Sequence, residues 1–284
     1  MPVPASVVAL RLALAALRAG GGALHEPAAS AVRRASALRL TDAERADEQA
    51  VAALYGRLAR SPATVEVVDY GAGTRGGARP PERAVADVVR RAATGPAWGR
   101  FLYGLARGLR PRRVLELGTH LGISAAHLGR ALARTDAEGR GHGELVTLEG
   151  APALADLARA HLDALAIGDR VEVVTGRFAD TLPGVLASRG PFDLVFIDGH
   201  HEEEAAFAYA TQIRARLAPG ALVVLDDVEP TRPVRRAWRR LRAAHPEDGA
   251  LWLGKLGLLS LGSDARLQGA APPVARETTS PSLR

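Results

Sequence analysis

The chain contains no cysteine, which excludes disulfide bonds and any mechanism built on a cysteine nucleophile. It also lacks any uninterrupted apolar run of the roughly eighteen residues that a membrane-spanning helix needs. We therefore expect no membrane span. With 284 residues and an apolar content of 47%, the chain is long enough to bury a full hydrophobic core.

The apolar start of the chain, residues 7–17, resembles the core of a signal peptide. No Lys or Arg precedes this stretch, and Arg11 interrupts it, so the sequence favours a short N-terminal helix and a cytoplasmic protein.

Lysine is almost absent, because Lys255 is the only one, and arginine carries nearly all of the positive charge. The net charge of +6 accompanies abundant Ala, Gly and Pro, a bias typical of GC-rich coding rather than of selection for phosphate binding. The densest basic cluster falls on one amphipathic helical segment and consists of Arg232, Arg235, Arg236, Arg239, Arg240 and Arg242. A solvated helix face is the favoured interpretation of this cluster, and a polyanion site is the alternative.

The order of elements predicts an α/β fold. Residues 5–60 have a helical pattern, and Thr41 and Glu44 have the spacing of a capping box. Two further helices are expected at 82–93 and 97–109. After residue 112, short β-rich runs alternate with helices, which indicates a parallel sheet. The expected strands are 112–117, 144–149, 171–175, 193–198 and 221–226, followed by a closing hairpin of 251–253 and 256–261.

These patterns predict a Rossmann-like, mostly parallel sheet of seven strands flanked by helices. Three segments are expected: an N-terminal helical extension or lid at 1–94, a catalytic domain at 95–262 and a loose tail at 263–284.

Two glycine-rich turns compete for a nucleotide site. The first, at residues 71–76, is a literal G-x-G-x-x-G. A dinucleotide site needs a helix to begin at that turn, but Pro80 and Pro81 follow it, and no strand ending in an acid appears about twenty residues later. We therefore interpret this segment as a loop, with a lid over the site as one role.

The second turn follows the strand at 112–117 and leads directly into a helix. Gly118 and Gly122 allow the backbone to approach a ligand closely. The next strand ends in Glu149, thirty-three residues after Glu116. A carboxylate in this place can accept hydrogen bonds from both hydroxyls of a ribose, each worth about 1.5–3 kcal/mol. The turn and the acid together predict a nucleoside site.

Four segments resemble class I S-adenosylmethionine-dependent methyltransferases, in the form found in catechol- and caffeoyl-CoA-type and bacterial O-methyltransferase-like proteins (methyltransferase domain 24). They are ELGTHLGIS at 116–124, VVTGRFADTLP at 173–183, FDLVFIDGHH at 192–201 and ALVVLDDV at 221–228. The resemblance covers about residues 95–262, and the first ninety residues fall outside the general family pattern.

The resemblance implies S-adenosylmethionine as the cofactor. Glu116 and Gly118 would hold its methionine end, with Ser124 near the carboxylate, and Glu149 would bind the ribose. The full set of implied cofactor-binding residues is Glu116, Gly118, Thr119, Gly122, Ser124, Glu149, Gly150, Arg177, Phe178, Asp180 and Asp198. Arg177, Phe178 and Asp180 would border the adenine, although Phe178 equally suits ordinary core packing.

The resemblance also implies a metal site and a base. In the catechol-type enzymes, an aspartate after the fourth strand and an Asp-Asn pair after the fifth bind a divalent metal; Asp198, Asp226 and Asp227 fall at these places. Carboxylates 4 Å apart repel by about 4 kcal/mol at an effective dielectric constant of 20, so Mg²⁺ or another divalent cation, a proton or a neighbouring Arg should neutralise them. Alternatively, Asp198 meets the cofactor's ammonium group and the pair caps the next helix.

The catalytic candidates are His201, His200 and Asp198. His201 occupies the place where the catechol-type enzymes carry a lysine, and no lysine lies within fifty residues of the motif. An imidazole, with an ordinary pKa of about 6.5, suits removal of a hydroxyl proton. Alternatively, the two histidines merely begin the next helix.

The resulting hypothesis is O-methylation of a small hydroxylated acceptor, with His- or metal-assisted deprotonation. The main alternative is methylation of RNA or another nucleic acid on the Arg-rich helix, but no NPPY-like segment follows the fourth strand. A polyamine-synthase-like transfer and a non-catalytic binding module are less favoured. A homodimer stays open, since the sequence does not address assembly.

Overall fold

The computed structural model describes residues 5–37, 39–68 and 82–262. The glycine-rich segment at 71–76 and the tail from 263 lie outside the described residues. The helices are α1 (Ala5–Gly20), α2 (Ala28–Ser36), α3 (Asp42–Leu58), α4 (Val85–Ala92), α5 (Pro96–Leu109), α6 (Ile123–Ala137), α7 (Pro152–Ala164), α8 (Phe178–Arg189), α9 (Glu203–Arg214) and α10 (Arg232–Ala244). The strands are β1 (Thr64–Glu66), β2 (Glu82–Ala84), β3 (Arg113–Leu117), β4 (Glu144–Glu149), β5 (Val171–Thr175), β6 (Phe192–Ile197), β7 (Leu217–Leu225), β8 (Gly249–Trp252) and β9 (Gly257–Ser260).

Seven strands form one mixed sheet in the order β5-β4-β3-β6-β7-β9-β8. The five strands from β3 to β7 pair in parallel, and the β8–β9 hairpin adds to β7 in the antiparallel direction. Strand β3 is central, and its Val114, Leu115 and Leu117 are fully buried, as expected for a parallel strand covered on both faces. The predicted Rossmann-like sheet with a closing hairpin is confirmed.

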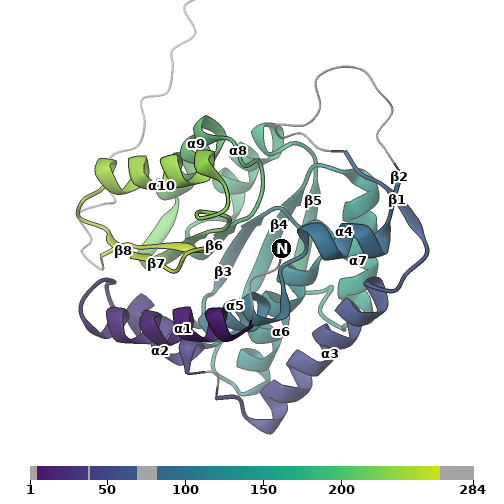
Figure 1. Ribbon diagram of the computed structural model, residues 1–284, viewed down its shortest axis with the longest axis horizontal. Helices are drawn as coiled ribbons and strands as arrows, with labels where there is room; N and C mark the ends of the chain where they lie inside the picture. Colours follow the sequence, from purple (N-terminus) through teal and green to yellow (C-terminus); the bar gives the residue numbers. More distant parts are fainter. Residues whose placement is uncertain (1–4, 38, 69–81, 263–284) are drawn as a thin grey trace, which may run out of the picture.

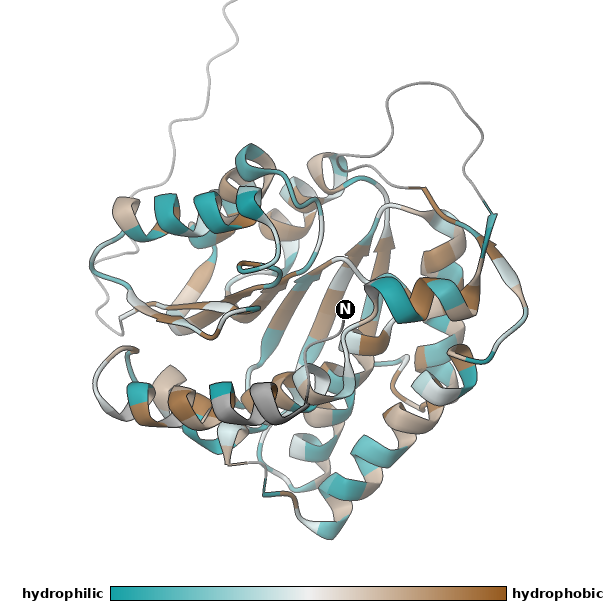
Figure 2. Ribbon diagram, in the orientation of Figure 1, coloured by the Kyte–Doolittle hydropathy of each residue, from teal (hydrophilic) through white to brown (hydrophobic). Residues whose placement is uncertain are grey.

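Helices cover both faces of this sheet (Figure 1). One apolar cluster joins α8, α9 and α10 to one face, and a second joins α5, α6 and α7 and the N-terminal helices to the other. The strands between these layers are mainly hydrophobic (Figure 2). Across the described residues, no helix is both long and apolar enough to cross a bilayer.

The N-terminal helices pack against the sheet domain. Helix α2 lies on α5, where a Cβ atom added at Gly104 or Gly108 would collide with Ala35 or Ala31 of α2. Helix α3 begins with the predicted capping box, in which the Thr41 hydroxyl accepts from the Glu44 N–H and the Glu44 carboxylate accepts from the Thr41 N–H. The helical extension is thus present, while its boundary at residue 94 stays a prediction.

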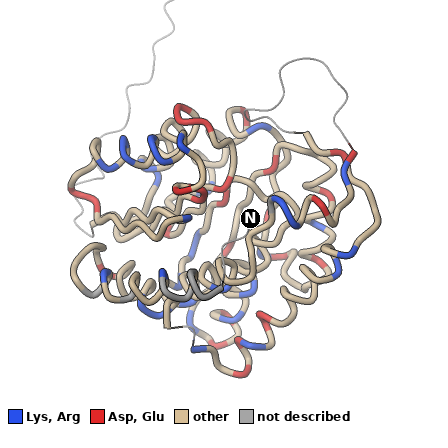
Figure 3. The backbone as a smooth tube through the Cα atoms, viewed as in Figure 1, with Lys and Arg blue, Asp and Glu red and all other residues tan. Residues whose placement is uncertain are grey.

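Helix α10 carries the Arg-rich cluster along the outer surface (Figure 3). Two of these arginines are engaged by the neighbouring helix α9: Arg236 pairs with Glu203, and Arg240 donates to Glu204 at 2.5 Å. The Arg240 guanidinium also lies 4.1 Å from the ring centre of Phe207. These contacts match the favoured interpretation, a helix face with solvated and locally paired charges.

Candidate functional site

The register of the sheet brings the predicted site residues to one edge. Leu117, the last residue of β3, pairs with Leu148 of β4 and with Ile197 of β6, and Ile197 pairs with Leu225 of β7. The residues that follow these positions, among them Gly118, Glu149, Asp198 and Asp226, therefore meet at the carboxyl ends of the strands. Open α/β sheets bind ligands at this edge.

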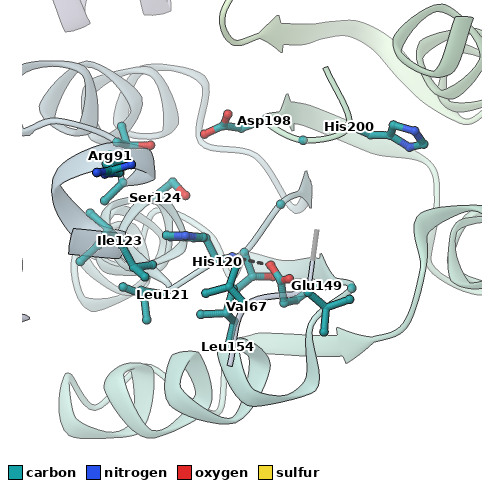
Figure 4. Close-up of a pocket in the computed structure, with 18 of the residues that line it drawn as sticks. Val67, Arg91, His120, Leu121, Ile123, Ser124, Glu149, Leu154, Asp198 and His200 are labelled. Carbon is teal, nitrogen blue, oxygen red and sulfur yellow. Dashed lines mark hydrogen bonds between the residues drawn. The ribbon is translucent and has the colours of Figure 1, made fainter. Parts of the chain in front are cut away.

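A cavity of about 860 Å³ opens at this edge, within the size range of small-molecule sites. Eleven of the predicted residues line it: Gly118, Thr119, Ser124, Glu149, Gly150, Arg177, Phe178, Asp198, His200, His201 and Asp227. Helix α4 also contributes to the wall through Val88 and Arg91. In the close-up, Arg91 and Ser124 lie on one side of the cavity and His200 on the other (Figure 4).

Four predicted residues do not contribute to the lining. Glu116 is completely buried behind the turn, Gly122 lies at the start of α6, and Asp226 is 2% exposed. Asp180 is exposed on the first turn of α8. Their predicted roles in cofactor or metal binding remain hypotheses.

The turn after β3 depends on its glycines. Gly118 has a φ of 104° and donates its N–H to the Leu148 carbonyl at 3.0 Å. A side chain at Gly118 would collide with the backbone oxygen of Asp198. Gly122, with a φ of 81°, is the residue from which α6 begins. These conformations favour glycine strongly, and they bring the turn against the end of β6.

Glu149 is held in place by the turn that it faces. Its Oε2 accepts the His120 N–H at 2.6 Å (Figure 4). Its Oε1 accepts the Ala151 N–H at 2.9 Å. Burial raises the pKa of Glu149, and the N–H donors counteract the rise. The carboxylate keeps acceptor capacity beyond these N–H donors, so hydroxyl groups could be accepted from the cavity.

Glu116 is a completely buried carboxyl in the central strand. Its Oε2 accepts from the Thr147 hydroxyl at 2.5 Å, which in turn lies 2.6 Å from the Thr119 hydroxyl. Burial raises the pKa of Glu116 to about 7, despite the nearby Ser124 and Thr147 hydroxyls. Its Oε1 accepts no well-aligned hydrogen bond from the described residues. A buried acid of this kind at the carboxyl edge of the sheet is a candidate functional residue.

His120 was not singled out from the sequence. It lines the cavity, its Nδ1 is buried, and no described residue partners that atom. Burial lowers the pKa of His120 to about 4, so the ring is neutral at pH 7 and can accept or donate one hydrogen bond at Nδ1 according to its tautomer. Together with Ser124 and Glu149, it gives the cavity polar groups suited to a polar ligand such as S-adenosylmethionine.

Lys255 was noted in the sequence as the only lysine but was not predicted to lie in the site. It lies in the turn between β8 and β9, lines the cavity, and forms an ion pair with Asp226. Its Nζ is 3.1 Å from Oδ1 of Asp227. Burial disfavours the ammonium, but the negative charges of Asp226, Asp198 and Asp227 outweigh this effect and raise the pKa of Lys255. Lys255 is therefore a positive charge beside these carboxylates, whereas the sequence analysis expected a divalent cation, a proton or a neighbouring Arg there.

The three aspartates differ in their surroundings. Burial, followed by the charge of Asp226, raises the pKa of Asp198 well above its usual range. Asp226 has its Oδ1 bonded to the Asp227 N–H at 2.7 Å and its Oδ2 bonded to Lys255, so its two oxygens are engaged within the protein. Asp227 keeps a half-buried carboxylate that faces the cavity.

The donor set that could hold a divalent metal therefore differs from the predicted one. Asp198, His201 and Asp227 each offer one ligand atom, and these atoms lie within 4.8 Å of one another. Asp226, the remaining member of the predicted trio, is paired with Lys255 and does not line the cavity, and its predicted role as a ligand stays a hypothesis. His201 joins the set instead, with its Nε2 3.9 Å from Oδ2 of Asp227.

His200 and His201 face different neighbours. The Nδ1 atom of His200 lies 3.1 Å from the Tyr209 hydroxyl, and the Tyr209 ring packs edge-on against Phe178. His201 is exposed and approaches Asp227. The geometry thus gives His200 a packing contact in the wall and leaves the imidazole of His201 open to the cavity.

Comparisons with known proteins agree with this arrangement. Residues 115–228 match the family model of a methyltransferase domain. A catechol O-methyltransferase of Mycobacterium tuberculosis is 42% identical over 139 residues, which are 49% of this chain and 58% of that relative. This chain thus spans less than two thirds of the length of that protein.

Two solved structures extend the likeness to the fold. An O-methyltransferase from Bacillus cereus in complex with SAH has a TM-score of 0.53 and 29% identity, and it covers 62% of this chain and 84% of its own. The cofactor-bound protein Rv0187 from MTB has a TM-score of 0.52 and 29% identity, with 79% and 91% of the two chains covered. Residues 115–228 of this chain are therefore similar to a methyltransferase domain, within a Rossmann-like sheet shared with solved methyltransferases, and the relatives named here are O-methyltransferases.

Proposed function

We propose that the protein transfers the methyl group of S-adenosylmethionine to a hydroxyl oxygen of a small acceptor. The observation that carries this proposal is one cavity that combines the Glu149 carboxylate with Asp198 and His201. The Glu149 carboxylate suits a ligand with two neighbouring hydroxyls. The His201 imidazole suits an acceptor with an acidic hydroxyl. The name of the mycobacterial relative makes catechols the first acceptor class to test.

In this proposal, Glu149 accepts hydrogen bonds from the ribose hydroxyls. Gly118, Ser124 and the neighbouring turn bind the methionine end, and Phe178 and Arg177 border the adenine. Asp198 then faces the positively charged part of the donor. The donor supplies an activated methyl group, so the protein mainly aligns the acceptor oxygen and excludes water.

His201 is the proposed base. Its exposed imidazole lines the cavity, and it can take the proton of the acceptor hydroxyl as the oxygen becomes nucleophilic. The Asp227 carboxylate, 3.9 Å away, would stabilise the imidazolium that forms. A histidine that ligates a metal through Nε2 could not accept this proton at the same atom. Direct base catalysis and metal ligation by His201 are therefore alternatives, and we propose the first.

Binding and transfer can be tested separately. Isothermal titration with S-adenosylmethionine and S-adenosylhomocysteine should give saturable binding to the folded protein. Labelled methyl transfer to a panel of catechols and other phenols, sugars and lipids should then identify the acceptor. A folded protein with no affinity for either nucleoside would refute the proposal, and methylation of RNA with no small-molecule product would replace the acceptor class.

A further inference from the structure

The chain's single lysine lies against the acidic end of the site. Lys255 pairs with Asp226 and lies 3.1 Å from Asp227. The contact is fixed by the backbone, because the Val228 N–H, directly after the aspartate pair, donates to the Lys255 carbonyl at 2.8 Å. The hairpin turn and the end of β7 are therefore bonded to each other at both the main chain and the side chain.

The ammonium of Lys255 lies among carboxylates. Asp198, Asp226 and Asp227 follow two adjacent strands and repel one another at close range. Two other buried acids among the described residues, Asp47 and Glu44, pair with arginine. The compact ammonium of a lysine, unlike a planar guanidinium, has the point-charge character that can take the place of a small metal ion.

The same contact argues against a dication at the predicted trio. Asp226 has its oxygens engaged by Lys255 and by the Asp227 N–H. The remaining donor set of Asp198, His201 and Asp227 would place a metal beside Lys255, a positive charge already bonded to Asp227. Repulsion between the two cations weakens metal binding at this set.

We propose that Lys255 is the resident cation of this site and takes the charge-neutralising place of a divalent metal. Its ammonium balances the aspartates, and it faces the cavity in which the acceptor oxygen becomes negative. The role toward the acceptor oxygen rests on the proposed methyl transfer. The balancing of the aspartates concerns only the charges of the folded protein.

The test compares Mn²⁺ binding to wild type, Lys255→Met and Lys255→Arg by titration with electron paramagnetic resonance detection, without cofactor or acceptor. We expect negligible binding to wild type below millimolar Mn²⁺ and to Lys255→Arg, and binding at least about tenfold tighter to Lys255→Met, since the competing charge is gone. Adding Asp198→Asn to Lys255→Met should remove this gain and thereby locate the ion. Thermal unfolding and binding of S-adenosylhomocysteine report whether each variant is folded.

Micromolar binding of Mn²⁺ to wild type at Asp198 would overturn the proposal, as would equal binding to folded Lys255→Met and wild type. If Lys255→Met does not fold, the Mn²⁺ titration and the turnover of wild type still show whether the site binds and needs a metal. Turnover that is unchanged by a strong chelator agrees with the proposal, and turnover that stops and is restored by Mg²⁺ or Mn²⁺ contradicts it. The Mn²⁺ titration needs no methyl acceptor, so failure of the proposed function would be seen separately as absent nucleoside binding.

Discussion

Replacing Glu149 with Gln should weaken the binding of S-adenosylhomocysteine by about 10- to 150-fold. Both carboxylate oxygens already accept a backbone N–H, from His120 and from Ala151, and the carboxylate keeps acceptor capacity for ribose hydroxyls. The amide keeps the size of the side chain but converts one acceptor into a donor and removes the charge. The loss of one charge-assisted hydrogen bond, about 1.5–3 kcal/mol, corresponds to this range of affinity.

Isothermal titration of wild type and Glu149→Gln measures the effect, and Glu144→Gln is the matched control. Glu144 begins the same strand, but its side chain is 62% exposed and far from the carboxyl edge of the sheet. We expect the control to bind like wild type. In the Glu149→Gln variant, the side-chain NH₂ group faces a backbone N–H donor that it cannot accept. Thermal unfolding should therefore show some destabilisation of this variant. Affinity of a folded Glu149→Gln within about twofold of wild type would refute the assignment of Glu149 to the ribose.

Three further predictions concern single groups. His201→Ala should lower kcat by about 10²–10⁴-fold, with unchanged affinity for S-adenosylhomocysteine, because only the base is lost; equal turnover would contradict its role. Burial raises the pKa of Glu116 from 4.5 to about 7, so wild type should lose about 3 kcal/mol of unfolding free energy relative to Glu116→Gln as the pH rises from 4.5 through 7. Urea denaturation at pH 5 and pH 8 measures this, and a pH-independent difference would rule it out. For Glu44, the pH dependence of the unfolding free energy has the opposite sign. Its pKa is about 2, because hydrogen bonds from Thr41 and Arg107 and the charge of Arg34 outweigh burial. Its contribution of about 3 kcal/mol relative to Glu44→Gln should be present above pH 4.5 and decline toward pH 2, as followed by denaturation in acid; constant stability there would exclude it.

The sequence predicted the sheet well because its strands are buried on both faces. A run such as Val114–Leu117 is apolar except for Glu116, and a Gly-rich turn and a helix follow it directly, so the type and order of the strands could be predicted. The same logic placed Glu149 and Asp198 at one edge, since the ends of parallel strands converge. These predictions depend on local pattern and on topology only.

Long-range side-chain contacts could not be predicted from local sequence patterns in this way. Lys255 reaches the site through an antiparallel hairpin, fifty-seven residues after Asp198, and no local spacing encodes that approach. One signal did exist: a lone lysine in an arginine-rich chain. His120 was overlooked because its importance comes from the burial of one ring atom, and the exposure of Asp180 reflects the rotation of α8, which periodicity does not fix.

The small-residue contact between α2 and α5 has a consequence far from that contact. Because Gly104 and Gly108 touch the backbone of α2, even a methyl group there would force the two helices apart. Helix α5 ends at Leu109, and only three residues separate it from β3. A displacement of α5 at this contact would therefore be passed to β3 through this short connection, and β3 leads into the turn at Gly118.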